Sequence, residues 1–143
     1  RGIYFFETLD SLIDGAEEAK CWAIHVRKYG RKWAVMEAKL ESDNYIDIFG
    51  NVEHRKLFDQ IKEVALGRHD DLGLDRNSFE ERTIYIKLEA SGVDLIRSMV
   101  DASRYERYYS YTVRRPQIQI CVKRGSCIKG VKLLQRGDRN EKG

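Results

Sequence analysis

The sequence has little cysteine, a single proline and no long hydrophobic run. Its three cysteines, Cys21, Cys121 and Cys127, form no CxxC pair and are too few for a disulfide framework. We therefore expect free thiols and an intracellular protein of the cytoplasm or the nucleus. No stretch approaches the roughly 18 apolar residues that a membrane-spanning helix needs, so no membrane partner is expected.

Several familiar motifs are also missing. The chain has no glycine-rich phosphate loop and no nucleophile elbow, which leaves nucleophilic catalysis without support. It has neither the signature of RNA-recognition motifs nor a GXXG clamp. We therefore expect no cofactor, and we expect an enzyme only under the nuclease alternative described below.

Charge is divided unevenly along the chain. The 143 residues carry a net charge of +3, yet residues 1–103 hold 15 Lys and Arg against 20 Asp and Glu. Residues 104–143 hold 11 against 3, so a mildly acidic part is followed by a block of net charge +8. A basic block of this kind usually marks a surface for an anionic partner, and the alternative is a tail that only aids solubility.

Hydrophobic periodicity predicts an α+β fold with a mostly antiparallel sheet and helices packed on it. Strands are expected at residues 3–7, 21–28, 32–41, 45–49, 83–89, 107–114, 117–124 and 127–134. Helices are expected from Thr8 or Asp10 to residue 20, from an Asn51 cap to residue 66, and from a capping box at Ser91 to residue 103. The apolar stripes predict a core that contains Leu57, Phe58, Ile61, Ile96, Met99, Ile118 and Ile120.

In this prediction the order strand, helix and three-stranded meander occurs twice. We expect a single domain over residues 1–143, and the alternative is two halves, 1–67 and 83–136, joined by a polar loop at 68–82. Loops of this length are uncommon in compact domains unless they are functional or disordered. Residues 137–143 are expected to form a flexible tail.

The last three predicted strands, joined by turns at Pro116 and at Gly125-Ser126, have one apolar face and one polar face. The polar face carries an aromatic ring, amides and cations, with further arginines beside it: Tyr108, Arg114, Gln117, Gln119, Lys123 and Lys132, flanked by Arg107 and Arg115. Cations can follow phosphates, a ring can stack on a base, and amides can contact base edges. The favoured prediction is binding of RNA or single-stranded DNA, and the alternatives are an ordinary solvated sheet face or docking of an acidic protein.

Glu37-Ala38-Lys39 lies on a predicted strand with both charged side chains on one face. The spacing resembles the motif of PD-(D/E)xK nucleases, and the expected order of helix, strand, strand with E-x-K, strand and helix is similar to their core. The resemblance implies that Glu37 holds Mg²⁺ and that Lys39 stabilises the attacked phosphate. The 21–28 strand lacks the second acidic ligand, so that ligand would have to come from elsewhere: Glu7, Asp14, Glu17 or Glu18.

A weaker metal hypothesis concerns the predicted polar loop. Asp70 and Asp71, together with His69 and Asp75, offer oxygen ligands for a hard cation, although the EF-hand pattern is absent. A solvated acidic loop is the ordinary interpretation. The sequence does not reveal the oligomeric state or the nucleic-acid type.

Overall fold

The computed structural model describes residues 2–26, 31–100 and 117–139, which form an α+β fold and confirm the predicted class. The elements are, in chain order, β1 (Ile3–Phe6), α1 (Gly15–His25), β2 (Lys32–Leu40), β3 (Tyr45–Asp47), α2 (Val52–Asp71), the 3-10 helix η1 (Arg76–Ser78), α3 (Arg82–Ala90), β4 (Leu95–Val100), β5 (Gln117–Val122), the 3-10 helix η3 (Gly125–Cys127) and β6 (Ile128–Asp138).

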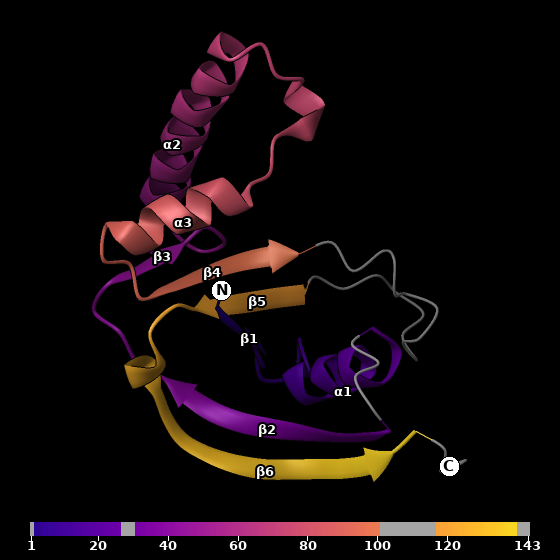
Figure 1. Cartoon of the computed structure of the whole chain (residues 1–143). Helices are drawn as coiled ribbons and strands as arrows, with labels where there is room; N and C mark the ends of the chain where they lie inside the picture. The colour runs from indigo at the N-terminus through magenta and orange to yellow at the C-terminus, as the bar shows by residue number, and fades with distance from the viewer. Residues whose placement is uncertain (1, 27–30, 101–116, 140–143) are drawn as a thin grey trace.

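The strands form two separate sheets. A four-stranded sheet has the order β1-β5-β4-β3, in which only the β3–β4 pair is parallel. Strands β2 and β6 pair antiparallel to form a two-stranded ribbon. Figure 1 shows three layers, with α2 and α3 above the larger sheet and with α1 and the ribbon below it.

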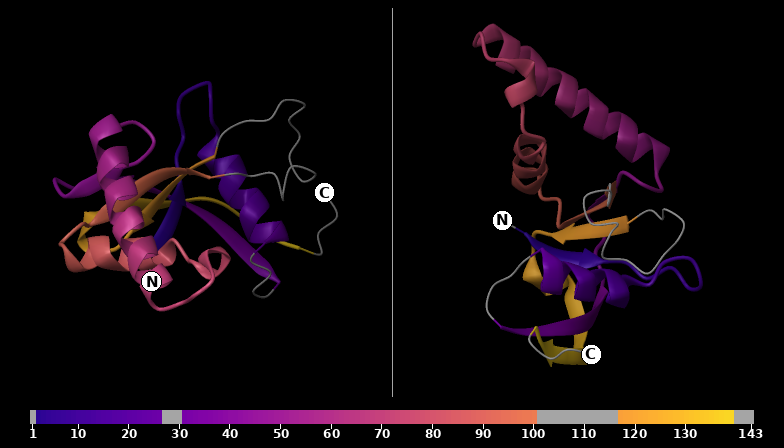
Figure 2. Two further views of the ribbon diagram at one scale, coloured as in Figure 1. Left: turned by 90° about the horizontal axis from the view of Figure 1, so that it is seen from above. Right: turned by 90° about the vertical axis from the view of Figure 1, so that its right-hand side faces the viewer.

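Each face of the larger sheet has its own apolar cluster. On one side Ile46 and Ile96 pack against Phe58 of α2 and against Ile84 and Leu88 of α3. On the other side the buried cluster consists of Leu95, Val122 and Cys127, with Leu40 and Ile128 of the ribbon among the residues packed against it. Both faces of the sheet are therefore covered, as the edge-on view in Figure 2 also shows.

Residues 21–25 were predicted as a strand and are instead the second half of α1. Asp14 is the N-cap of this helix, since its Oδ1 accepts hydrogen bonds from the backbone N–H groups of Ala16 and Glu17. The predicted Thr8 contributes from outside the helix, because its hydroxyl accepts a hydrogen bond from the N–H of Gly15 at 3.0 Å. A Cβ atom at Gly15 would lie 2.6 Å from the carbonyl oxygen of Phe6, so only glycine fits where the helix begins against β1. The prediction failed because the short, largely apolar segment 22–26 is compatible with a helix or with a strand.

The strand predicted at 83–89 is α3, and the helix predicted after Ser91 is β4. Ile84 and Leu88, four residues apart, are both buried against the sheet, which fits a helix. Ser91 ends α3 rather than starting a helix, because its hydroxyl donates to the carbonyl oxygen of Lys87 at 3.0 Å. Gly92, at φ 91°, then turns the chain into β4.

The predicted C-terminal meander is also wrong in its pairing. Strand β5 pairs with β1 and β4, and η3 carries the chain across to the ribbon, where β6 pairs with β2. Gly137 and Asp138, predicted as tail, are the last residues of β6. Helix α2 keeps its Asn51 cap but continues past Gly67 to Asp71, which shortens the predicted polar loop. The strand predicted at 107–114 lies outside the described residues.

Most of the predicted core residues are inside. Phe58, Ile96 and Ile118 are buried, and Ile61 and Ile120 are partly buried against the two clusters. Leu57 and Met99 are exceptions, with 42% and 59% of their surfaces exposed. The three cysteines are buried and form no disulfide bond, as predicted. In the described part of the chain, no helix is both long enough and apolar enough to cross a membrane.

Candidate nucleic-acid interface

Half of the predicted nucleic-acid surface lies outside the described residues. This half contains the aromatic ring and three arginines: Tyr108, Arg107, Arg114 and Arg115. The structure places the other four predicted residues. Gln117 and Gln119 lie on β5, Lys123 follows β5, and Lys132 lies on β6. The two strands belong to different sheets, so these four residues do not share one sheet face.

The two glutamines of β5 are not on an open surface. Gln117 is 2% exposed, and its amide Nε2 donates to a carboxylate oxygen of Glu18, itself buried on α1. Gln119 is partly buried and lies opposite Ser98 of β4 in the sheet register. Neither glutamine is freely exposed to a base edge in this structure.

Lys123 follows β5 and is largely covered. Its side chain is 6% exposed, and its Nζ lies 3.5 Å from Oε2 of Glu89 on α3. The sheet face that was predicted to be solvated is therefore the face on which α3 packs. The sequence prediction missed this because it assigned residues 83–89 to a strand, so the helix that carries Glu89 over Lys123 was not expected.

Lys132 remains at the surface, in the ribbon. Its Nζ lies 3.1 Å from Oε2 of Glu37, the residue directly across from it on β2. Lys39 is opposite Lys129 in the same ladder, so four charged residues lie close together on two neighbouring strands. We call Lys39, Lys129 and Lys132 the lysine cluster, and all three are exposed.

The lysine cluster is only partly neutralised. Lys132 pairs with Glu37, and Lys39 pairs with Glu41 at 3.1 Å. Lys129 forms no ion pair with any residue that the structure describes. Like charges directly opposite one another in an antiparallel pair destabilise it, so the Lys39–Lys129 position favours an anion above the ribbon.

The nuclease alternative finds its two residues on β2, as predicted, but in a different setting. The strand expected before β2 is helix α1, and the strand beside β2 is β6. Glu37 is paired with Lys132, and Lys39 is paired with Glu41. The proposed order of elements around the E-x-K segment is therefore not the observed one.

Three of the four carboxylates suggested as a second metal ligand are engaged in other contacts, and Glu17 is the exception. Glu7 accepts hydrogen bonds from Arg97, Asp14 caps α1, and Glu18 accepts from Gln117. Glu7 does border the same pocket as Glu37, a hollow of about 520 Å³ between β1, α1 and the ribbon. The described residues contain no group of three or more His, Cys, Asp or Glu side chains placed to hold a metal ion.

In the predicted acidic loop, Asp70 is hydrogen-bonded to another side chain of the same segment. Asp70, at the end of α2, accepts hydrogen bonds of 3.0 and 2.7 Å from Nε and Nη2 of Arg76. The hydrogen bond from Arg76 holds the pKa of the Asp70 carboxyl below its ordinary value, with burial opposing the shift. Asp71 is the last residue of α2 and is exposed. The Asp70–Arg76 ion pair therefore fixes the end of α2, and the segment does not form an open cation site.

An ionic network that sequence analysis missed connects β4 with the ends of β1 and β3. Arg97 of β4 donates to Glu7 at 2.7 Å and to Asp47 at 3.0 Å, and its guanidinium lies 4.9 Å from the ring centre of Phe49. Burial lowers the pKa of Arg97, but the hydrogen bonds and charges of Glu7 and Asp47 outweigh burial and raise it overall. The partners are 90 and 50 residues away in the chain, so no local pattern signals the network.

Comparisons of this chain with protein-family models, with curated proteins and with solved structures found no match.

Proposed function

We propose that the chain binds single-stranded nucleic acid, RNA or single-stranded DNA, through its basic C-terminal part, with the lysine cluster of the ribbon as one contact surface. The observation that carries the proposal is the exposed Lys39–Lys129 pair, in which two cations face each other across neighbouring strands. A phosphate placed between them would relieve their repulsion.

Charge in the surrounding sequence supports this choice of partner. Residues 104–143 have a net charge of +8, and β6 carries three exposed cations, Lys129, Lys132 and Arg136. At roughly 3.3 Å per residue, the 11-residue strand is about 36 Å long, enough to follow several phosphates. The arginines and the tyrosine predicted to take part, Arg107, Arg114, Arg115 and Tyr108, extend the basic sequence before β5.

The test measures binding of fluorescently labelled poly-U RNA and poly-dT DNA over a series of salt concentrations. Lys129→Ala and Lys39→Ala should each weaken binding to both strands. Each should also reduce the slope of log affinity against log salt by about 0.7 if the lysine contacts one phosphate, since that contact releases counterions. Lys56→Ala is the matched control, because Lys56 is an exposed, ion-paired lysine on α2.

A second comparison separates stacking from charge. Tyr108→Ala should lower affinity by roughly 1–3 kcal/mol and leave the salt slope unchanged, because stacking of a base releases no counterions. If the Lys39 and Lys129 double variant binds both oligonucleotides as tightly as the unmodified chain, the proposed contact is wrong. Salt-dependent binding of an acidic polypeptide without binding of oligonucleotides would instead favour a protein-docking surface.

A further inference from the structure

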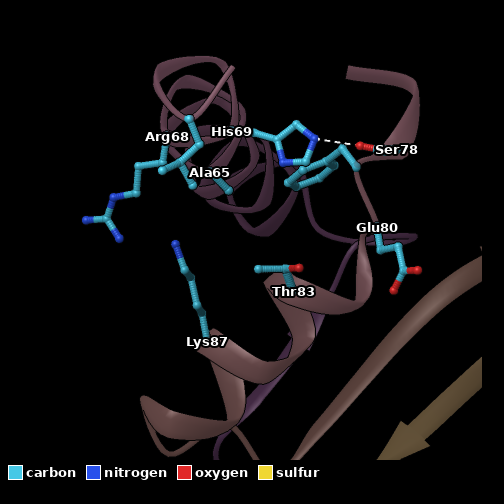
Figure 3. A pocket seen from close by; sticks show the side chains of 9 residues that line it. Ala65, Arg68, His69, Ser78, Glu80, Thr83 and Lys87 are labelled. Carbon is cyan, nitrogen blue, oxygen red and sulfur yellow. Dashed lines mark hydrogen bonds between the residues drawn. The ribbon is translucent and has the colours of Figure 1, made fainter. Parts of the chain in front are cut away.

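A pocket of about 440 Å³ lies between α2, η1 and α3, on the opposite side of the larger sheet from the ribbon (Figures 1 and 3). One face of α2 and one face of α3 form its walls. The α2 wall consists of residues at spacings of three and four, Ala65, Arg68, His69 and Leu72. The α3 wall presents Thr83 and Lys87, one turn apart. A volume of this size suits a small ligand.

Two cations lie at the same end of this pocket. Figure 3 shows Arg68 from α2 and Lys87 from α3 side by side, with Thr83 nearby and its hydroxyl on the side away from them. Neither cation forms an ion pair within residues 2–26, 31–100 and 117–139, although most other basic side chains there do. At the helical positions three and four residues away, the one acid is Asp71, three residues after Arg68, and these two described side chains form no ion pair. Two neighbouring, unneutralised cations form a suitable environment for a phosphate.

The rest of the pocket is lined by apolar and polar side chains, among which the His69 ring is fixed in position. The ring of His69 lies edge-on to Phe79, with 5.7 Å between the ring centres. Its Nε2 is 2.9 Å from the Ser78 hydroxyl and 2.8 Å from the carbonyl oxygen of Asp75, so the imidazole is held in one orientation (Figure 3). Glu80 stands at the end away from the cations and can accept a hydrogen bond. The pocket therefore offers a cationic end, a ring-lined middle and an acceptor.

We propose that this pocket binds a small phosphate ester that carries a flat ring with a hydrogen-bond donor, such as a nucleoside monophosphate. Arg68 and Lys87 would hold the phosphate, and His69 and Phe79 would contact the ring. The site is separate from the lysine cluster and does not depend on nucleic-acid binding there.

The experiment titrates the full chain with adenosine 5′-monophosphate and records backbone amide NMR signals. The expected result is saturable binding, with the largest shifts in Ala65–Leu72 and Thr83–Lys87. Adenosine should bind at least roughly tenfold more weakly, since a charge-assisted contact contributes about that much, and inorganic phosphate should compete. Equal affinity for adenosine would overturn the phosphate assignment, and so would the absence of saturable binding.

Two substitutions test where the phosphate group binds. Arg68→Gln and Lys87→Gln should each weaken binding of adenosine 5′-monophosphate by roughly tenfold or more, with an unchanged melting temperature. Arg55→Gln is the matched control, because Arg55 is an exposed arginine of the same helix outside the pocket. An equal loss in Arg55→Gln would show a diffuse charge effect and would overturn the site. A lower melting temperature with unchanged ligand affinity would show that the cations only complement the carbonyl ends of their helices.

Discussion

The ammonium group of Lys123 lies 3.5 Å from the carboxylate of Glu89, and this pair joins the end of β5 to α3. Because α3 covers this side of the sheet, the lysine is 6% exposed, while its partner is 44% exposed. A residue that the sequence suggested as a nucleic-acid contact is therefore placed to stabilise the fold.

Lys123→Ala should lower the free energy of unfolding by about 1–3 kcal/mol, because it removes a charged contact that is closed to solvent on one side. Urea unfolding followed by circular dichroism measures this change. Lys132→Ala, which removes an exposed pair, should change stability by no more than about 0.5–1 kcal/mol. If both variants have the same small effect, Lys123 is not held as the structure describes.

Arg97→Met should destabilise the chain by about 3 kcal/mol or more, because it leaves two partly buried carboxylates, Glu7 and Asp47, without their cation. The same unfolding measurement detects the loss. Arg97→Lys should recover only part of it, since an ammonium cannot reach both carboxylates with the planar fork of a guanidinium. Full recovery by lysine would mean that charge alone, and not bidentate geometry, holds the strand ends together.

The pKa of Asp70 should lie below its ordinary value of 3.8, because Arg76 donates hydrogen bonds to the charged carboxylate. Since the pKa is lower in the folded state, the stabilisation from this pair is fully present above the unfolded pKa. It is lost as pH falls below about 4 and through the folded pKa. A carboxyl NMR titration measures the pKa directly. In Arg76→Gln the pKa of Asp70 should return toward 3.8, and an unchanged pKa would show that the Asp70–Arg76 pair does not form in solution.

With Mg²⁺ or Mn²⁺ present, the purified chain should leave RNA and DNA uncut. Glu37 and Lys39 are engaged by Lys132 and Glu41, and the strand order around them differs from that of the nuclease core. A gel assay with both nucleic acids checks this. Metal-dependent cutting that disappears in both Glu37→Gln and Lys39→Met would reverse our conclusion and make Glu7, across the shared pocket, the next residue to replace.

Features set by near neighbours in the chain were predictable from the sequence. Asn51 was recognised as a cap because its side chain accepts from the N–H of His54, three residues ahead. Strands β1 and β2 were found from their β-branched and aromatic residues, and the α+β class followed from mixed periodicity. The charge of the C-terminal part is a property of composition and needs no structure.

Pairing and coverage were decided only by the tertiary structure. Residues 83–89 suit either a strand or a helix, and packing against Ile96 of β4 and Phe58 of α2 selects the helix. Strand β2 pairs with β6, whose residues lie 88 to 106 positions further along the chain, because η3 directs the chain away from β5. Lys123 and Lys132 look alike in the sequence, yet one is covered by α3 and the other faces solvent. Burial depends on which distant segment packs over a side chain, and local sequence does not contain that information.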